Sequence, residues 1–444
     1  MSAKRARPQP KTPLGRIFAN TAWLLGGKGF SAICGLAYLA ILTRTLGLKG
    51  FGHFSLIFGT AQALIAIAGF QTWRVVVRYG SEHIHNREWD KFGRLSMLCG
   101  ALDVVGAVCG CAIAAAVIYG FGHALDINPA YVNTAFLFNC AAVCAVVSAP
   151  TGIVRALHRF DMAVYVEAGV AIGRGLGAVG IWLSGPHGGR FFAASAAVDL
   201  IEAALYWAMA RRLSPAAVKL SHLRDWRQAL AENEGLVHFF GVTYTGATLT
   251  ALVRYGPLLA VGALVGTKAG GLYRLSGQLT QSMSKLSTLL TRAVYTEVAR
   301  ARVAETTSEF RKLALRTSLF AGIAGAVVVG IALMGGEEFG KGAVILVPLA
   351  IAASLELASV AFEPVLHSTG HARKALFARF VSAAALGVAL YFLIDKGPSG
   401  AAWGVAVGGA VGFVLMGIMA YRPLQRIERG DERLPASTDA EAGL

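Results

Sequence analysis

Charged residues are scarce: Asp, Glu, Lys and Arg make up only 15% of the 444 positions. An average soluble domain is about one-quarter charged, so a soluble protein of this length could not cover its core. Hydrophobic residues reach 55% and the mean hydropathy is +0.57. The apolar residues form runs of about 20, the length that crosses the hydrocarbon layer of a bilayer. The composition therefore predicts an all-α integral membrane protein.

Catalytic and metal-binding motifs are also missing. The sequence has no phosphate-binding glycine loop, no nucleophile elbow and no His/Cys cluster with the spacing of metal ligands. Its six cysteines lie within apolar segments of the first half, where they are expected to serve as small packing residues. We therefore expect a protein that is not an enzyme and that needs no cofactor or metal.

What the chain does have is a series of apolar segments joined mostly by short links. Twelve are expected, near 19–43, 51–77, 95–120, 131–154, 162–183, 191–210, 237–264, 269–294, 314–334, 343–366, 376–394 and 399–421. Within the fourth segment, Thr151 and Gly152 beside Pro150 predict a helix kink.

The longest link divides these segments into two halves of six. It is polar with spaced apolar residues, and predicts an amphipathic helix on the cytoplasmic membrane surface. The spaced residues are Val218, Leu220, Leu223, Trp226 and Leu230. The expected organisation is a basic cytoplasmic tail (1–18), an N-lobe (19–212), the amphipathic linker (213–236), a C-lobe (237–421) and a second cytoplasmic tail (422–444).

The basic residues predict the orientation. The formal net charge is +16, which in a soluble protein would suggest nucleic acid. In a membrane protein it reflects the excess of Lys and Arg in cytoplasmic loops. With the N-terminus inside, the inner segments carry roughly five times as many Lys and Arg as the outer segments. We therefore expect both termini in the cytoplasm, a multi-pass place in a bacterial inner (cytoplasmic) membrane, and no nucleic-acid partner.

A short internal repeat supports the division into lobes. LGLKGFGHFSL (46–56) and VGTKAGGLYRL (265–275) align at an offset of 219 residues, and each lies on the first outer turn of its half. The offset matches Gly47 with Gly266 and Lys49 with Lys268. Six helices per half give the two copies the same orientation, as in transporters built from parallel repeats. Two unrelated glycine turns could give the same short match.

Ionisable residues inside the predicted spans are candidates for a transport site, because buried charges are costly in lipid and usually face a cavity or a partner. The candidate substrate-binding cations are Lys28, Arg74, Arg78, Arg174, Arg254, Arg274, Lys285 and Arg292. The candidate ion-coupling acids are Asp103, Glu167, Asp199, Glu202, Glu356 and Glu363. Two interpretations stay open: these charges brace helices in pairs, or they line a hydrated cavity that binds an anion such as a pyrophosphate.

The first eighty residues resemble the polysaccharide-transporter family, the Wzx-type flippases of the MOP exporter superfamily. The similarity is carried by Asn20-Thr21 before the first helix, by the helix end Thr43-Arg44-Thr45-Leu46-Gly47, by Gly50-Phe51-Gly52, and by Arg74 and Arg78 closing the second helix. The resemblance implies a twelve-helix, two-lobed MOP-type exporter fold with a V-shaped cationic cavity between the lobes.

The same resemblance implies a function. Such proteins move undecaprenyl-pyrophosphate-linked oligosaccharide from the cytoplasmic to the periplasmic leaflet, for lipopolysaccharide O-antigen, capsule or exopolysaccharide. It implies membrane lipid and polysaccharide polymerase machinery as partners, and allows coupling to a proton or sodium gradient.

Two other functions remain open from the sequence. A multidrug, cation-coupled exporter of the same superfamily would share the fold, although several deep basic residues argue against a cavity for cationic drugs. A membrane glycosyltransferase or polymerase is disfavoured, because the expected outer loops are too short to hold catalytic residues.

Overall fold

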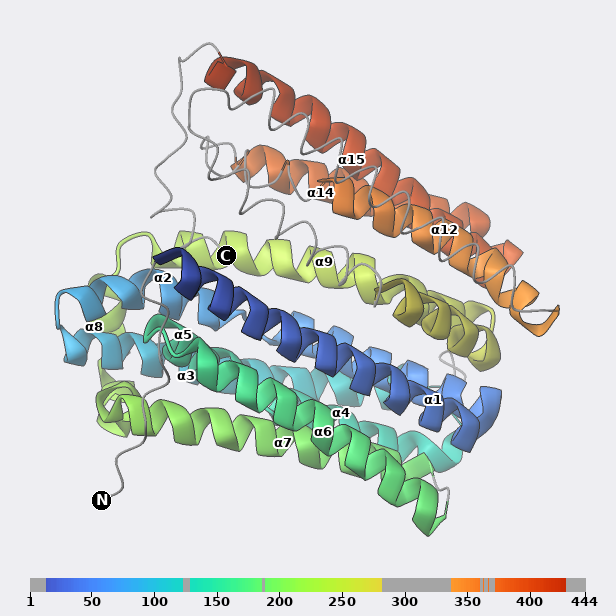
Figure 1. Ribbon diagram of the computed structural model, residues 1–444, viewed down its shortest axis with the longest axis horizontal. Coiled ribbons are helices and arrows are strands. Elements are labelled where there is room, and N and C mark those ends of the chain that lie inside the picture. Colours follow the sequence, from blue (N-terminus) through green and yellow to red (C-terminus); the bar gives the residue numbers. More distant parts are fainter. Residues whose placement is uncertain are drawn as a thin grey trace.

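The computed structural model is a bundle of long helices that run nearly side by side (Figure 1). It describes residues 13–122, 128–185, 188–281, 337–359, 362, 366 and 372–428. Within those ranges every regular element is helical. The all-α membrane fold expected from composition is confirmed.

The N-lobe, as the structure has it, consists of α1 to α7. Their bounds are α1 Pro13–Ala68, α2 Thr72–His85, α3 Trp89–Ala115, α4 Val132–Cys144, α5 Ser148–Ala156, α6 Phe160–Ser184 and α7 Gly188–Leu213. The short α8 (Trp226–Ala231) lies in the linker. The C-lobe contains α9 (Leu236–Leu264), a helix over 267–281, α12 (Glu337–Ser359), α14 (Ala372–Leu393) and α15 (Pro398–Glu428).

Helix α9 joins the two lobes. It packs against α1 and α2 on one side and against α14 and α15 on the other, and Figure 1 shows it between the two groups of helices. The α14–α15 pair approaches closely, because Gly408 of α15 lets its backbone carbonyl accept a 2.7 Å hydrogen bond from Ser382 Oγ.

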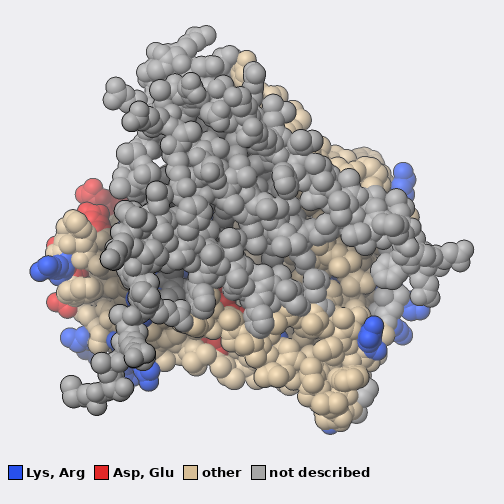
Figure 2. All heavy atoms as spheres, in the orientation of Figure 1, with Lys and Arg blue, Asp and Glu red and all other residues tan. Residues whose placement is uncertain are grey.

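Eight helical segments in the described part of the chain are long and apolar enough to cross a bilayer. They account for the second to seventh and the last two of the twelve expected segments, while 314–334 and the end of 269–294 lie outside the described residues. Figure 2 shows that, among the described residues of the visible face, most of the Lys and Arg side chains lie towards its two ends.

The first expected turn falls at Gly47, where α1 changes direction. Gly47 has φ 63° and ψ 178°, a conformation essentially restricted to glycine. Its partner in the repeat, Gly266, also has a positive φ, 108°. The aligned glycines therefore perform the same backbone task in both lobes.

Two of the expected spans are broken in the middle. The segment 51–77 is interrupted between Ala68 and Thr72, and 131–154 between Cys144 and Ser148. The second break is where a kink was expected, one turn earlier than Pro150 itself. Proline at 150 has no N–H for the carbonyl of Val146 and clashes with it. That carbonyl instead accepts a 3.1 Å hydrogen bond from Trp207 Nε1.

The linker is not one amphipathic helix, and that prediction needs correction. It consists of 3-10 turns at Pro215–Val218 and Leu220–Asp225, followed by α8. The apolar residues predicted to share one face divide into two sets. Val218 and Leu230 pack against the N-lobe, whereas Leu220, Leu223 and Trp226 are exposed.

A glycine substitution tests the turn at Gly47. Gly47→Ala should lower the free energy of unfolding by about 1–3 kcal/mol, because alanine is strained at this backbone conformation. Gly35→Ala in the same helix, where a Cβ meets nothing within 4 Å, should be neutral or slightly stabilising. Thermal unfolding of the purified protein compares the two variants; equal melting temperatures would contradict the assignment.

Candidate functional site

A pair of arginines meets on one tryptophan near the predicted inner end of the N-lobe. The guanidinium carbon of Arg155, in the last turn of α5, lies 4.6 Å from the centre of the Trp73 ring. That of Arg74 lies 5.2 Å from the same ring. Arg78, one turn further along α2, is 4.5 Å from the Phe239 ring of α9. A guanidinium stacks on an aromatic ring by cation–π attraction, and its planar fork of donors matches the geometry of a carboxylate or phosphate.

These arginines lie on the half-helices α2 and α5, which begin at the two breaks. In a bilayer, the backbone groups freed by such breaks must find partners inside the protein. The N-terminal N–H groups of a helix also carry partial positive charge, so a carboxylate is a favourable partner for them.

Asp103 of α3 bonds to both breaks, through a side-chain hydroxyl at the first and a backbone N–H at the second. Its carboxylate, only 4% exposed, accepts hydrogen bonds from Thr72 Oγ1 at 2.7 Å and from the Ala149 backbone N–H at 2.8 Å. The Ser148 hydroxyl lies 2.9 Å from Thr72 Oγ1 and accepts a 3.1 Å hydrogen bond from the Trp73 N–H. One buried acid therefore fixes the first turns of α2 and α5 together.

A second set of charges joins α6 and α7. Arg174 donates a 2.5 Å hydrogen bond to Asp199, and the two side chains are 33% and 11% exposed. Glu167 precedes Arg174 by seven residues and lies on the same face of α6, but the ion pair of Arg174 is with the adjacent helix. Glu202, one turn further along α7, interacts electrostatically with Arg174, Asp199 and Glu167.

Further residues interact electrostatically with this set of charges, on both sides of the Arg174–Asp199 pair along the helices. Towards the predicted inner end, Tyr206 interacts electrostatically with Glu167, Glu202 and Arg155. In the other direction, Tyr38 of α1 interacts with Arg174 and Asp199. We call these seven residues the polar track; they are Tyr38, Arg155, Glu167, Arg174, Asp199, Glu202 and Tyr206. The track runs through the N-lobe from the level of Tyr38 to the Trp73 arginines.

Arg274, another of the candidate cations, contacts the other lobe. It donates a 2.9 Å hydrogen bond to the backbone carbonyl of Ser55, 219 residues earlier, and its guanidinium carbon lies 4.5 Å from the Phe58 ring. The separation equals the repeat offset, so equivalent positions of the two lobes touch each other. Nearby, Gly52 approaches so closely that a Cβ there would overlap the Thr267 carbonyl. Arg274 therefore joins the predicted outer ends of the lobes.

The remaining candidates are more scattered. Arg254 is exposed on α9 and donates a 2.7 Å hydrogen bond to Gln281, and Glu356 is exposed near the end of α12. Lys28 belongs to α1, but its side chain, like Lys285, Arg292 and Glu363 as a whole, lies outside the described residues.

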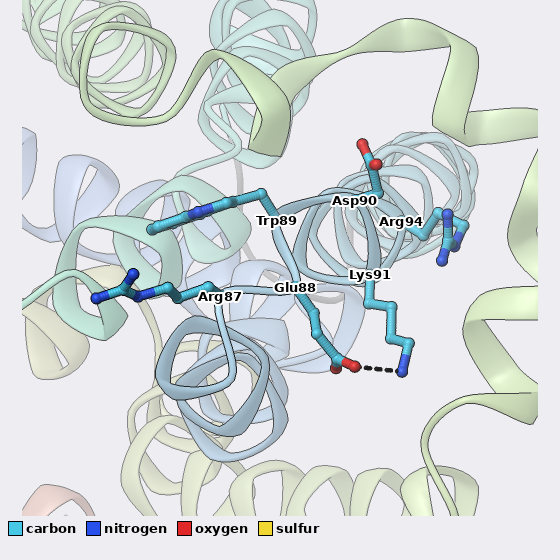
Figure 3. A pocket seen from close by; sticks show the side chains of 6 residues that line it. All are labelled: Arg87, Glu88, Trp89, Asp90, Lys91 and Arg94. Atoms are coloured by element: carbon cyan, nitrogen blue, oxygen red, sulfur yellow. Dashed lines mark hydrogen bonds and ion pairs between the residues drawn. The ribbon is translucent and has the colours of Figure 1, made fainter.

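A polar pocket of about 380 Å³ lies at the α2–α3 connection. Figure 3 shows Glu88 and Lys91 joined within it, with Trp89 and Arg87 to the side. The Lys91 ammonium, and with it His83, holds the pKa of the Glu88 carboxyl below its ordinary value. Among the described residues no group of three or more His, Cys, Asp or Glu could hold a metal.

Comparison with known proteins identifies the family. The model of the family described as polysaccharide biosynthesis protein matches residues 17–296, more than half of the chain. The chain belongs to this family.

Individual relatives agree with the assignment. The inner membrane protein YghQ of Escherichia coli (strain K12) is 25% identical over 289 residues, 64% of this chain and 80% of the relative. A multidrug resistance MATE family transporter of the MOP superfamily, in its inward-facing conformation, shares the fold at TM-score 0.63 and 15% identity, over 90% of this chain and 96% of that one. The outward-facing conformation gives TM-score 0.58 and 14% identity, over 92% and 95%.

These findings confirm the family, the MOP-type exporter fold and the expected place as a multi-pass protein of the inner membrane. The fold is the one shared by the solved multidrug resistance MATE family transporters.

Three site residues of this polysaccharide-family protein are not identified by the charge pattern. Arg155 sits one residue past an expected span, and Trp73 and Tyr38 carry no charge. The kink expected near Pro150 is the signal that could have revealed Arg155. After a break, the half-helix that follows can still pack inside the protein, and Arg155 lies on that half-helix.

Asp103→Asn tests the joint between the two breaks. The amide keeps one acceptor oxygen but turns an NH₂ towards a donor, so the free energy of unfolding should fall by about 1–3 kcal/mol. Thermal unfolding measures the loss. Asp395→Asn, at an exposed position after α14, is the matched control and should be neutral; an unchanged Asp103→Asn variant would show that the joint is dispensable.

The Arg174–Asp199 pair is testable by a double-mutant cycle. Asp199→Asn leaves a largely enclosed guanidinium without its carboxylate, so it should cost more in the wild type than in the Arg174→Gln background. The expected coupling is about 0.5–3 kcal/mol from unfolding of the four proteins. Additive effects would mean that the pair does not brace α6 against α7.

Proposed function

We propose that this protein moves undecaprenyl-pyrophosphate-linked oligosaccharide from the cytoplasmic to the periplasmic leaflet, for O-antigen, capsule or exopolysaccharide synthesis. The observation that carries the proposal is the pair Arg74 and Arg155 on Trp73, in a chain of the polysaccharide biosynthesis family. Guanidinium groups bind phosphate oxygens in a bidentate manner, and an aromatic ring offers an apolar surface to a sugar.

The mechanism is alternating access between the lobes. The head group enters beside the Trp73 arginines and passes along the polar track, while the polyprenyl chain stays in lipid. The contact of Arg274 with Ser55 holds the predicted outer ends together in the present arrangement. Its separation, with closure at the inner end, releases the head group outwards. No covalent step is required.

Ion coupling, if the transport is driven by a proton or sodium gradient, falls to the acids of the polar track. Glu167 is exposed and Glu202 half-buried, so both are accessible to a cation. Asp103 already accepts two hydrogen bonds, and we assign it to holding the helices. Polysaccharide polymerase machinery is the expected partner downstream of release.

Export of cationic drugs is the second candidate, and the acids of the track favour it. Asp199, Glu202 and Glu167 outnumber Arg174 between Tyr38 and Tyr206, and the similar solved folds are multidrug transporters. The two functions differ in what the Trp73 arginines do: they bind an anionic head group in one, and repel a cationic drug in the other.

Replacement of the Trp73 arginines tests the proposal. Arg74→Gln and Arg155→Gln should each lower the surface polysaccharide restored in a flippase-deficient host. Loss of one charge-assisted hydrogen bond, about 1.5–3 kcal/mol, corresponds to roughly a ten- to hundredfold loss in affinity. Arg190→Gln is the control, because Arg190 is exposed and bonds only to the adjacent α6–α7 turn in the contacts described.

Membrane abundance of every variant is measured in parallel. Normal abundance with undiminished polysaccharide in both arginine variants would refute the proposal. Resistance to cationic drugs conferred by the wild type, without any restored polysaccharide, would favour the second candidate instead.

A further inference from the structure

The linker between the lobes presents a narrow apolar stripe to its surroundings. Leu220, Leu223 and Trp226 are 73%, 38% and 47% exposed. Residues 220–225 form a 3-10 helix, in which side chains three apart lie above one another. The spacing of three therefore aligns Leu220 with Leu223 along one edge, and Trp226 follows three residues later as the first residue of α8.

The opposite side of the linker is fixed to the N-lobe, so the stripe has a defined direction. His222, between the stripe residues, is 6% exposed and packs against Gly93 of α3. Arg94 of α3 binds Glu232 through two hydrogen bonds, of 2.6 and 3.1 Å. His83 of α2 shares a 3.0 Å hydrogen bond with Asn233. The linker therefore moves with the N-lobe as one body.

Basic residues flank the stripe. Arg224 and Arg227, also three apart, are exposed next to it. Arg211 and Arg212 occupy the last turn of α7, and exposed Lys219 directly precedes Leu220. The 17 residues from 211 to 227 contain one acid, Asp225.

We propose that this surface, the stripe with its five cations, docks onto anionic phospholipid of the cytoplasmic leaflet. Three features choose lipid over another occupant. The surface follows directly after a membrane-spanning helix, so it lies at headgroup depth. Tryptophan with flanking cations is the typical composition of a membrane interface. The positive charge complements an anionic leaflet, which attracts each nearby Lys or Arg. The proposal does not depend on which substrate is transported.

Photo-crosslinking in a bilayer tests the proposal. A benzophenone amino acid replaces Leu223, or Leu220 in a second variant, in the full-length protein. Nanodiscs contain phosphatidylcholine alone or mixed with phosphatidylglycerol, and lipid adducts are measured by mass spectrometry after irradiation. The control places the same amino acid at Gln228, which is exposed but bonds to Glu232.

The expected result is lipid adducts at 223 and 220, few at 228, and enrichment of phosphatidylglycerol over its share of the bilayer. The combined Arg224→Gln and Arg227→Gln variant should reduce that enrichment at least about fivefold, the effect of a single cation near an anionic surface. Adducts to protein, equal adducts at 228, or none at either stripe position would overturn the proposal. Adducts without preference for phosphatidylglycerol would overturn its anionic part.

Discussion

A helix that breaks inside a bilayer leaves backbone groups without water, and the structure of the N-lobe depends on how this cost is met. The chain breaks two spans at the same depth and places one carboxylate, Asp103, between them. A helix N-terminus attracts an anion, and here one buried acid bonds to the first residue of α2 and to a backbone N–H in the first turn of α5, which joins the two helices. The functional consequence is that α2 and α5 project Arg74 and Arg155 onto the same tryptophan.

The lobes meet through matched rather than arbitrary surfaces. The turns at Gly47 and Gly266 have the same role in each half, and Ser55 contacts Arg274 at the repeat offset. A contact between equivalent positions lies on the axis that relates the halves. Two lobes joined there can separate without either having to unfold, which is the motion that alternating access requires. By contrast, the linker is bonded to the N-lobe through Arg94 and His83, so it is no free tether.

The sequence predicts the membrane class and most of the spans well, because the length of an apolar run is set mainly by the thickness of the hydrocarbon layer that it must cross. It predicts the repeat from a short match that pairs Gly47 with Gly266 and Lys49 with Lys268, and in the structure both glycines have a positive φ. The site is harder to predict. Depth and charge single out Arg174 and Asp103 as ionisable residues within spans, but cannot show that one pairs with Asp199 and the other holds two helix ends. The contact of Arg274 with the other lobe is likewise hidden, because a charge pattern does not show which neighbour a helix face meets. The linker differs from its predicted α-helix because its 3-10 turns pack against α3. Such tertiary contacts leave no pattern in the local sequence.

The central claim is that the arginines held by the two breaks carry an anionic lipid-linked head group across the membrane. The most direct measurement is the rate at which a fluorescent undecaprenyl-pyrophosphate oligosaccharide crosses the bilayer of proteoliposomes containing the purified protein. The account predicts a rate well above that of protein-free vesicles, and inhibition by added undecaprenyl pyrophosphate but not by the neutral alcohol undecaprenol. A rate equal to that of empty vesicles, or equal inhibition by the two lipids, would contradict it.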